Sequence, residues 1–251
     1  MAISLSTSSG PTAGGTAVTI TGTGGSLVTT SSVKFGLASA TIVGTPTATT
    51  VDVTSPAGSG VVPVTVTTAG GSSAPVSWFY VPPPIKTGIS PSSGLAAGGD
   101  TVTITGQNLS AATAVDFGTG NPGTITASGA GSITVTSPAG TGTVSVSVTT
   151  PGGTIDGVYF GYCATPTVTA PTTGTPATGS EAGGNAVSIT GTNLTGTTAI
   201  TFGALAAPFV VISATEVDAI VPAGTGTVDV GVTTCGGTAT VTGGYTYIAP
   251  P

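Results

Sequence analysis

The chain has 251 residues, of which 42 are glycine and 19 are proline, and only 4% are charged. Two lysines, no arginine and no histidine leave a net charge of −6, so the chain lacks the cations that bind nucleic-acid phosphates or an anionic membrane surface. Helix formers are scarce, and no apolar run approaches the ~20 residues of a membrane span. These features predict an all-β protein with no nucleic-acid partner and no membrane insertion.

The chain contains a threefold internal repeat. Ala-Gly-Gly starts at residues 13, 97 and 182, and five further markers follow it each time in the same order. These markers are a Val-Thr-Ile-Thr-Gly-type segment (18–22, 102–106, 187–191), a hydrophobe-x-Phe-Gly unit (33–36, 115–118, 200–203), Pro-Ala-Gly (56–58, 138–140, 222–224), Val-Thr-Thr-x-Gly-Gly (66–71, 148–153, 232–237) and aromatic-x-Tyr (78–80, 160–162, 245–247). Such an ordered recurrence predicts three copies of one domain.

Each copy alternates apolar and hydroxyl side chains in the manner of β-strands. Val102 and Ile104 alternate with threonines over 101–105, and valines alternate with serine and threonine over 143–148, so one face of each strand suits a core and the other suits solvent. Segments rich in glycine and proline separate the strands, and residues 150–153 predict a tight hairpin. About seven strands per copy predict a small Greek-key β-sandwich.

Aromatic side chains occupy matching places in the three copies. Each buries about 150–250 Å² when enclosed, so we expect these residues to form the three cores. They are Phe35, Trp78, Tyr80, Phe117, Phe160, Tyr162, Phe202, Tyr245 and Tyr247.

The motifs resemble the IPT/TIG family of immunoglobulin-like domains, which occurs in plexins, some transcription factors and bacterial surface proteins. The resemblance rests on Ser93-Gly94 before the second Ala-Gly-Gly, on the Gly-x-Asn loops that end at Asn108 and Asn193, and on the Val-Thr-Ile-Thr-Gly, Phe-Gly, Pro-Ala-Gly and Val-Thr-Thr-Pro-Gly-Gly elements. It covers almost the whole chain, although a fold hosts many functions.

The resemblance implies three tandem immunoglobulin-like β-sandwiches of the IPT/TIG type, arranged as a rod. The expected domains are 1–82, 83–163 and 164–251. The proline-rich segment 81–86 and the segment 163–166 are the expected linkers, the first of them short and semi-rigid.

The two cysteines lie at the start of the third copy (Cys163) and in its last hairpin (Cys235). These places lie at the same end of an immunoglobulin-like sandwich, so we expect a disulfide, which would close a loop of about 72 residues and stabilise the fold by roughly 4 kcal/mol in the chain-entropy model. Two free thiols, or a metal-binding or catalytic thiol, are the alternatives, and the missing histidine disfavours a metal site. A disulfide would place the protein outside a reducing cytosol.

The remaining polar residues predict no catalysis. Glu216 and Asp218 lie on one strand face, but an acid–base pair needs a cleft to shift its pKa values, so we expect solvated charges. Asp100 and Asn185 follow Ala-Gly-Gly, where a calcium ion would need more oxygens than one per copy. Without histidine, no Ser-His-Asp arrangement can form. We expect no enzyme activity, no cofactor and no metal ion.

The sequence favours a structural or interaction protein outside the cell. Our first hypothesis is a bacteriophage virion protein, a head decoration or tail appendage with weak attachment to cell-surface glycans, because residues 1–5 carry no secretion signal. The alternatives are a fragment of a secreted bacterial adhesin or stalk, its signal removed, and a carbohydrate-binding accessory module. The expected partners are other structural proteins of the virion or cell surface, further copies of the chain, and surface glycans. The sequence names no ligand-binding residue.

Overall fold

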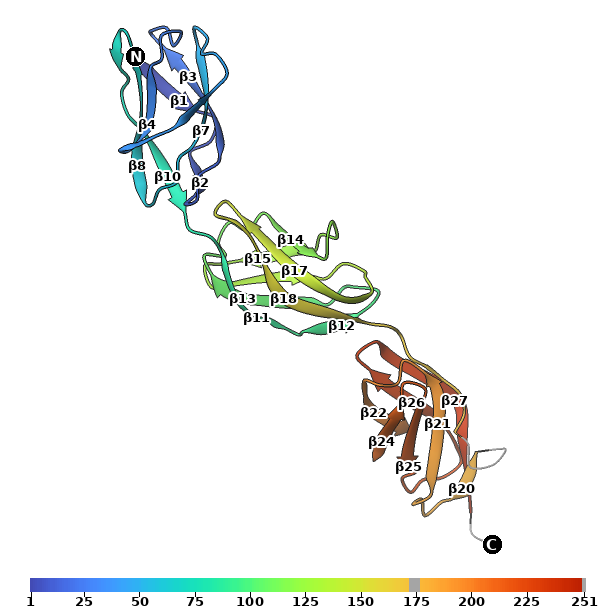
Figure 1. The fold of residues 1–251 in the computed structure, drawn as a ribbon. Helices are drawn as coiled ribbons and strands as arrows, with labels where there is room; N and C mark the ends of the chain where they lie inside the picture. Colours follow the sequence, from blue (N-terminus) through green and yellow to red (C-terminus); the bar gives the residue numbers. More distant parts are fainter. Residues whose placement is uncertain (172–176, 250–251) are drawn as a thin grey trace.

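The computed structural model describes residues 1–171 and 177–249. Three β-sandwiches follow one another along a gently bent line (Figure 1). We name them unit 1 (strands β1–β10), unit 2 (β11–β18) and unit 3 (β19–β27). The described residues include no helix of the length and apolar character needed to cross a membrane.

Unit 1 consists of a four-stranded and a six-stranded sheet. The four-stranded sheet has the order β1 (Ala2–Leu5), β3 (Ala17–Thr23), β7 (Thr50–Thr54), β6 (Thr41–Val43). The six-stranded sheet has the order β2 (Ser9–Pro11), β10 (Val76–Val81), β8 (Val61–Thr68), β4 (Ser32–Phe35), β5 (Ala38–Ser39), with β9 (Gly71–Ser72) also paired to β8.

Units 2 and 3 repeat this architecture. In unit 2 the sheet orders are β11 (Ile85–Ser90), β13 (Thr101–Gln107), β16 (Ser132–Thr136), β15 (Thr124–Ser128), and β12 (Ser93–Leu95), β18 (Gly153–Cys163), β17 (Gly142–Thr150), β14 (Ala114–Phe117). In unit 3 they are β19 (Thr167–Val168), β21 (Ala186–Thr192), β25 (Glu216–Ile220), β24 (Phe209–Ser213), and β20 (Thr178–Ser180), β27 (Gly237–Ile248), β26 (Thr227–Thr234), β22 (Thr197–Phe202), β23 (Leu205–Ala207).

The linkers are shorter than the sequence predicts. Val81 ends β10 and Ile85 begins β11, so only Pro82–Pro84 connect unit 1 to unit 2. Cys163 likewise ends β18 and does not lie in the connection itself. The strands continue to these points because each edge finds a hydrogen-bonding partner in the sheet. We propose the domain boundaries 1–82, 83–163 and 164–251 on this basis.

Each unit divides its first strand between the two sheets. The first part runs antiparallel to its neighbour, as β11 does to β13, and the second part crosses over to pair in parallel with the last strand, as β12 does with β18. In unit 2 the crossing segment is held by Asp100, whose Oδ2 accepts a hydrogen bond from the backbone N–H of Leu95 at 2.7 Å. A Cβ at Gly94 would lie 2.2 Å from the same oxygen. Asp100 therefore ties down the crossing strand.

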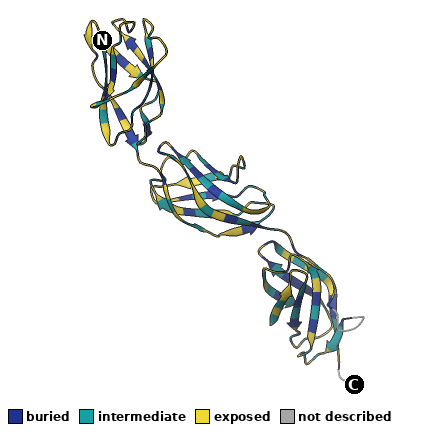
Figure 2. Cartoon of the chain, in the orientation of Figure 1, coloured by how far each residue is buried: buried dark blue, intermediate teal, exposed yellow. Residues whose placement is uncertain are grey.

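The predicted aromatic residues lie at the centre of each core. Buried residues alternate with exposed ones along the strands (Figure 2). In each unit an edge-to-face aromatic pair joins the two strands that flank β8, β17 or β26 in the sheet. Such pairs contribute about 0.5–1.5 kcal/mol beyond the area they bury. The pairs are Phe35–Trp78, Phe117–Phe160 and Phe202–Tyr245, with ring centroids 5.1, 5.2 and 5.3 Å apart.

The Pro-Ala-Gly marker packs against the last tyrosine of its unit. A Cβ at Gly140 would lie 2.4 Å from Cε2 of Tyr162, so any side chain there displaces the ring. The same contact occurs between Gly58 and Tyr80 (2.5 Å) and between Gly224 and Tyr247 (2.6 Å). Packing alone accounts for the recurrence of this motif.

Candidate functional site

The connection between units 2 and 3 is tied to two loops of unit 3. A Cβ at Gly236, in the last hairpin, would lie 2.0 Å from the carbonyl oxygen of Ala164. Nδ2 of Asn193 donates a hydrogen bond to the carbonyl oxygen of Thr165 at 2.9 Å. These two contacts hold the connecting chain against the end of unit 3.

A disulfide joins Cys163 to Cys235 at this same junction. The Cα atoms are 5.7 Å apart and the sequence separation is 72 residues. Cys163 ends the last strand of unit 2, whereas Cys235 lies in the last hairpin of unit 3. The bond therefore links unit 2 to unit 3. The structure places the two cysteines together at this junction.

The connection between units 1 and 2 has the same two contacts without a disulfide. A Cβ at Gly152 would lie 2.0 Å from the carbonyl oxygen of Pro82. Nδ2 of Asn108 donates a hydrogen bond to the carbonyl oxygen of Pro83 at 3.0 Å. The Gly-x-Asn loop and the Gly-Gly hairpin thus both contact the preceding linker and hold it against the end of the unit.

Lys86 lies just beyond this junction and joins the two sheets of unit 2. Its Nζ donates a hydrogen bond to the carbonyl oxygen of Val146 on β17, next to a shift in the β17–β18 register. Burial lowers the pKa of Lys86, and the nearby negative charge of Asp156 partly opposes that change. One of the two lysines of the chain therefore has a structural role.

The last tyrosines of the three units share a position but differ in their hydroxyl partners. Tyr80 and Tyr247 donate hydrogen bonds of 2.8 Å to the carbonyl oxygens of Pro56 and Pro222. The buried hydroxyl of Tyr162 has no partner among the described residues. Burial raises the pKa of all three tyrosines, and the charge of Asp100 raises that of Tyr162 further.

Two of the acidic residues considered in the sequence analysis, Asp100 and Glu216, are held by hydrogen bonds within the fold. Glu216 accepts a hydrogen bond from Ser188 at 2.7 Å. Asp218 lines a small apolar hollow of about 160 Å³ with Phe209 and Ile220, and Glu216 is not part of that lining. The described part of the chain has no group of three His, Cys, Asp or Glu residues that could hold a metal ion.

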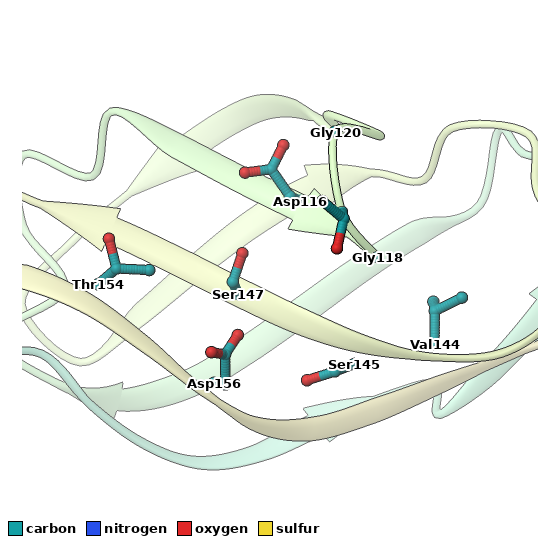
Figure 3. Close-up of a pocket in the computed structure, with 9 residues that line it drawn as sticks. Asp116, Gly118, Gly120, Val144, Ser145, Ser147, Thr154 and Asp156 are labelled. Atoms are coloured by element: carbon teal, nitrogen blue, oxygen red, sulfur yellow. The ribbon is translucent and has the colours of Figure 1, made fainter.

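Unit 2 has an open hollow of about 610 Å³ on the outer face of the sheet β12–β18–β17–β14. Asp116 from β14, Ser147 from β17 and Asp156 from β18 line it, and a loop at 118–120 borders it. Figure 3 shows the two carboxylates on opposite sides of β17, with Ser147 between them. The volume lies within the ~300–1,000 Å³ typical of small-molecule sites.

The carboxylates of the hollow keep their acceptor capacity. Within residues 1–171 and 177–249, neither Asp116 nor Asp156 accepts a hydrogen bond, although Asp156 interacts electrostatically with Lys86. Four other acidic residues are engaged by hydrogen bonds, namely Asp52, Asp100, Glu216 and Asp229. Two carboxylates that accept no hydrogen bond among the described residues therefore line the same hollow.

An exposed aromatic residue lies beside this hollow. Tyr159 pairs with Ser145 across β18 and β17, so its side chain is a direct neighbour of the Ser145 side chain, which lines the hollow. The tyrosine is 62% exposed. Sequence reasoning missed Tyr159 and treated the acidic residues as solvated charges. A comparison of the three copies position by position would have found both.

Solved structures with a similar fold come from several extracellular proteins. The plexin A4 extracellular region shares 22% identity over 88% of this chain and 20% of its own (TM-score 0.46). SGBP-B from a xyloglucan utilization locus of Bacteroides uniformis shares 23% over 64% of this chain and 49% of its own (TM-score 0.30). FdeC, an Escherichia coli adhesin, shares 13% over 100% of this chain and 96% of its own (TM-score 0.29). At these identities and TM-scores the similarities carry no argument about this chain.

The family is shown by the sequence itself. No curated protein sequence matches the chain. The family model of the IPT/TIG domain matches it three times, at residues 3–80, 84–164 and 166–248. The chain therefore belongs to the IPT/TIG domain family, as three tandem immunoglobulin-like domains.

Proposed function

We propose that the chain is a non-catalytic binding and display protein of an extracellular surface, with an adhesin-like role. The observation that carries this proposal is the repeated junction: three sandwiches lie in line, and the linker before each of units 2 and 3 is held by a hairpin glycine and a loop asparagine. Ties of this kind restrict bending between units. A restrained rod suits a protein that holds a binding surface away from its anchoring layer.

The disulfide supports the extracellular part of the proposal. Cys163 and Cys235 link two units rather than stabilising a single core, and such bonds persist in oxidising compartments. The surface of the rod carries few charges, so binding depends on close contact and not on long-range attraction.

The chemistry of the side chains supports a binding role rather than catalysis. The chain has no histidine, and serine and threonine are weak nucleophiles without an adjacent base. The hydrogen bonds of Asp100, Glu216 and Asp229 commit these carboxylates to the fold. Surface glycans are the ligands we propose for such a rod.

Virion decoration is the competing assignment, since a restrained rod of this type also suits a phage particle. Immunogold electron microscopy with an antibody to this chain, applied to the cells that produce it, separates the two. We expect label on the cell envelope. Label confined to phage particles would assign the chain to the virion, and label confined to the cell interior would contradict both assignments.

A further inference from the structure

We propose that the hollow on unit 2 binds a sugar unit of a neutral glycan. Asp116 and Asp156 accept hydrogen bonds from the ligand hydroxyls, and Tyr159 offers an aromatic face for the apolar side of the sugar ring. This inference rests on the proposed function and deepens it, because it names the ligand class and the place where it binds.

The fold does not require the two residues that face each other across β14 and β17. Asp116 pairs with Ser147 in unit 2. The corresponding pair is Lys34 with Thr65 in unit 1 and Thr201 with Gly231 in unit 3. The three pairs differ in charge and size on the same backbone, so the acidic residue at this place is a property of unit 2 alone.

Tyr159 is also particular to unit 2. In unit 1 the pair that corresponds to Tyr159–Ser145 is Ser77–Pro63, and in unit 3 the residue before the buried aromatic is Gly244. Serine, tyrosine and glycine are thus all compatible with the strand. Because the Tyr159 ring is exposed to solvent, it adds no buried apolar area to the core and does not stabilise the fold in that way.

Asp156 lies where the β17–β18 pairing is irregular. The register shifts between Val146 and Val148, opposite the segment from Ile155 to Val158 that contains Asp156 and Gly157. Gly157 has a φ of 118°, which favours glycine. The corresponding strands of unit 1 pair from Val76 onwards without such a shift. Bulges of this kind redirect side chains and occur often beside binding sites.

The chemistry of the hollow favours a neutral polyol. Its lining contains two carboxylates, several hydroxyl groups and no cation, so sulfated, phosphorylated or carboxylated sugars are repelled. Carboxylates form strong charge-assisted hydrogen bonds with hydroxyl donors. Calcium prefers six to eight oxygen ligands, and the hollow offers two carboxylates on separate strands.

Saturation-transfer difference NMR on the full chain tests the proposal. The probes are neutral hexasaccharides of glucose, galactose, mannose, xylose and N-acetylglucosamine, with a heparin hexasaccharide as a charged probe. Calcium chloride is the second charged probe, and its binding is measured by isothermal titration calorimetry because calcium carries no protons. We expect at least one neutral hexasaccharide to bind and both charged probes to leave the hollow empty. Tyr159→Ser, which installs the unit 1 residue, should weaken binding about fivefold to tenfold, and Asp116→Asn or Asp156→Asn at least about tenfold.

Matched variants separate the hollow from the rest of the rod. Phe79→Ala removes another exposed aromatic and Asp52→Asn another acid, both in unit 1, and both should retain full binding. Equal melting temperatures establish that the variants are folded. The proposal is overturned if no neutral hexasaccharide binds, if only calcium or heparin binds, or if the unit 2 variants bind as well as the controls. Any of these results leaves the proposed surface role standing when immunogold label lies on the envelope, whereas label inside the cell removes that role irrespective of sugar binding.

Discussion

Gly152 touches Pro82 more closely than any other residue type would allow, since a Cβ at Gly152 would lie 2.0 Å from the proline carbonyl oxygen. Gly236 has the same relationship to Ala164, again at 2.0 Å. Neither glycine has a positive φ, so the backbone conformation alone would admit alanine. In unit 1 a Cβ at the corresponding Gly70 would meet only Thr68, at 3.7 Å. The glycine is therefore required by the contact between the hairpin and the linker.

Gly152→Ala should loosen the first junction without unfolding unit 2. The added methyl group cannot share space with the Pro82 carbonyl, so the hairpin moves away from the linker. Small-angle X-ray scattering should then show a broader distribution of maximum dimensions. Gly70→Ala is the matched control and should scatter like the parent chain. Identical scattering of all three proteins would show that the contact does not restrain the junction.

Breaking the disulfide should destabilise the second junction. In the chain-entropy model a loop of 72 residues corresponds to roughly 4 kcal/mol, an upper figure if the unfolded chain keeps some structure. The double variant Cys163→Ser, Cys235→Ser should lower the denaturant midpoint of unit 3. The parent chain in reducing agent should behave like that variant.

A mass measurement provides the direct check of this bond. Intact mass spectrometry before and after reduction should show a gain of two hydrogens, and a thiol reagent should not label the native chain. Labelling of two thiols in protein isolated under oxidising conditions would contradict the predicted disulfide.

The fold could be predicted from the sequence because its markers are local and occur three times. The alternation of apolar and hydroxyl side chains over 101–105 indicates a strand, and the Gly-Gly pairs indicate hairpins, each within a short segment. The function of Gly152 could not be predicted in this way, because its partner Pro82 lies in the linker, about 70 residues earlier in the chain, and a Gly-Gly pair also suits an ordinary turn. The hollow was missed for a related reason: Asp116, Asp156 and Tyr159 are unremarkable singly, and only the sheet register brings them together.

The three last tyrosines offer a comparison within one molecule. Tyr80→Phe and Tyr247→Phe each remove a buried hydrogen bond to a proline carbonyl oxygen and should cost about 1 kcal/mol of unfolding free energy. Tyr162→Phe removes a buried hydroxyl that has no partner among the described residues, so it should be neutral or stabilising. Urea titration of each variant measures this difference. An equal loss at all three positions would show that Tyr162 is hydrogen-bonded in solution.

The same tyrosines should make the rod sensitive to alkali. Burial raises the pKa of Tyr80, Tyr162 and Tyr247 from the ordinary value of 10.0, so the folded protein holds these protons more tightly than the unfolded chain does. Their contribution is complete below about pH 10 and is lost as the pH rises through the folded-state pKa values. Urea midpoints should therefore fall above about pH 10, and the fall should be smaller in the triple Tyr→Phe variant.

Both proteins should carry Cys163→Ser and Cys235→Ser, so that alkaline cleavage of the disulfide plays no part. Tyr159→Phe, at an exposed position, is the control. An undiminished fall in the triple variant would assign the alkaline sensitivity to other groups.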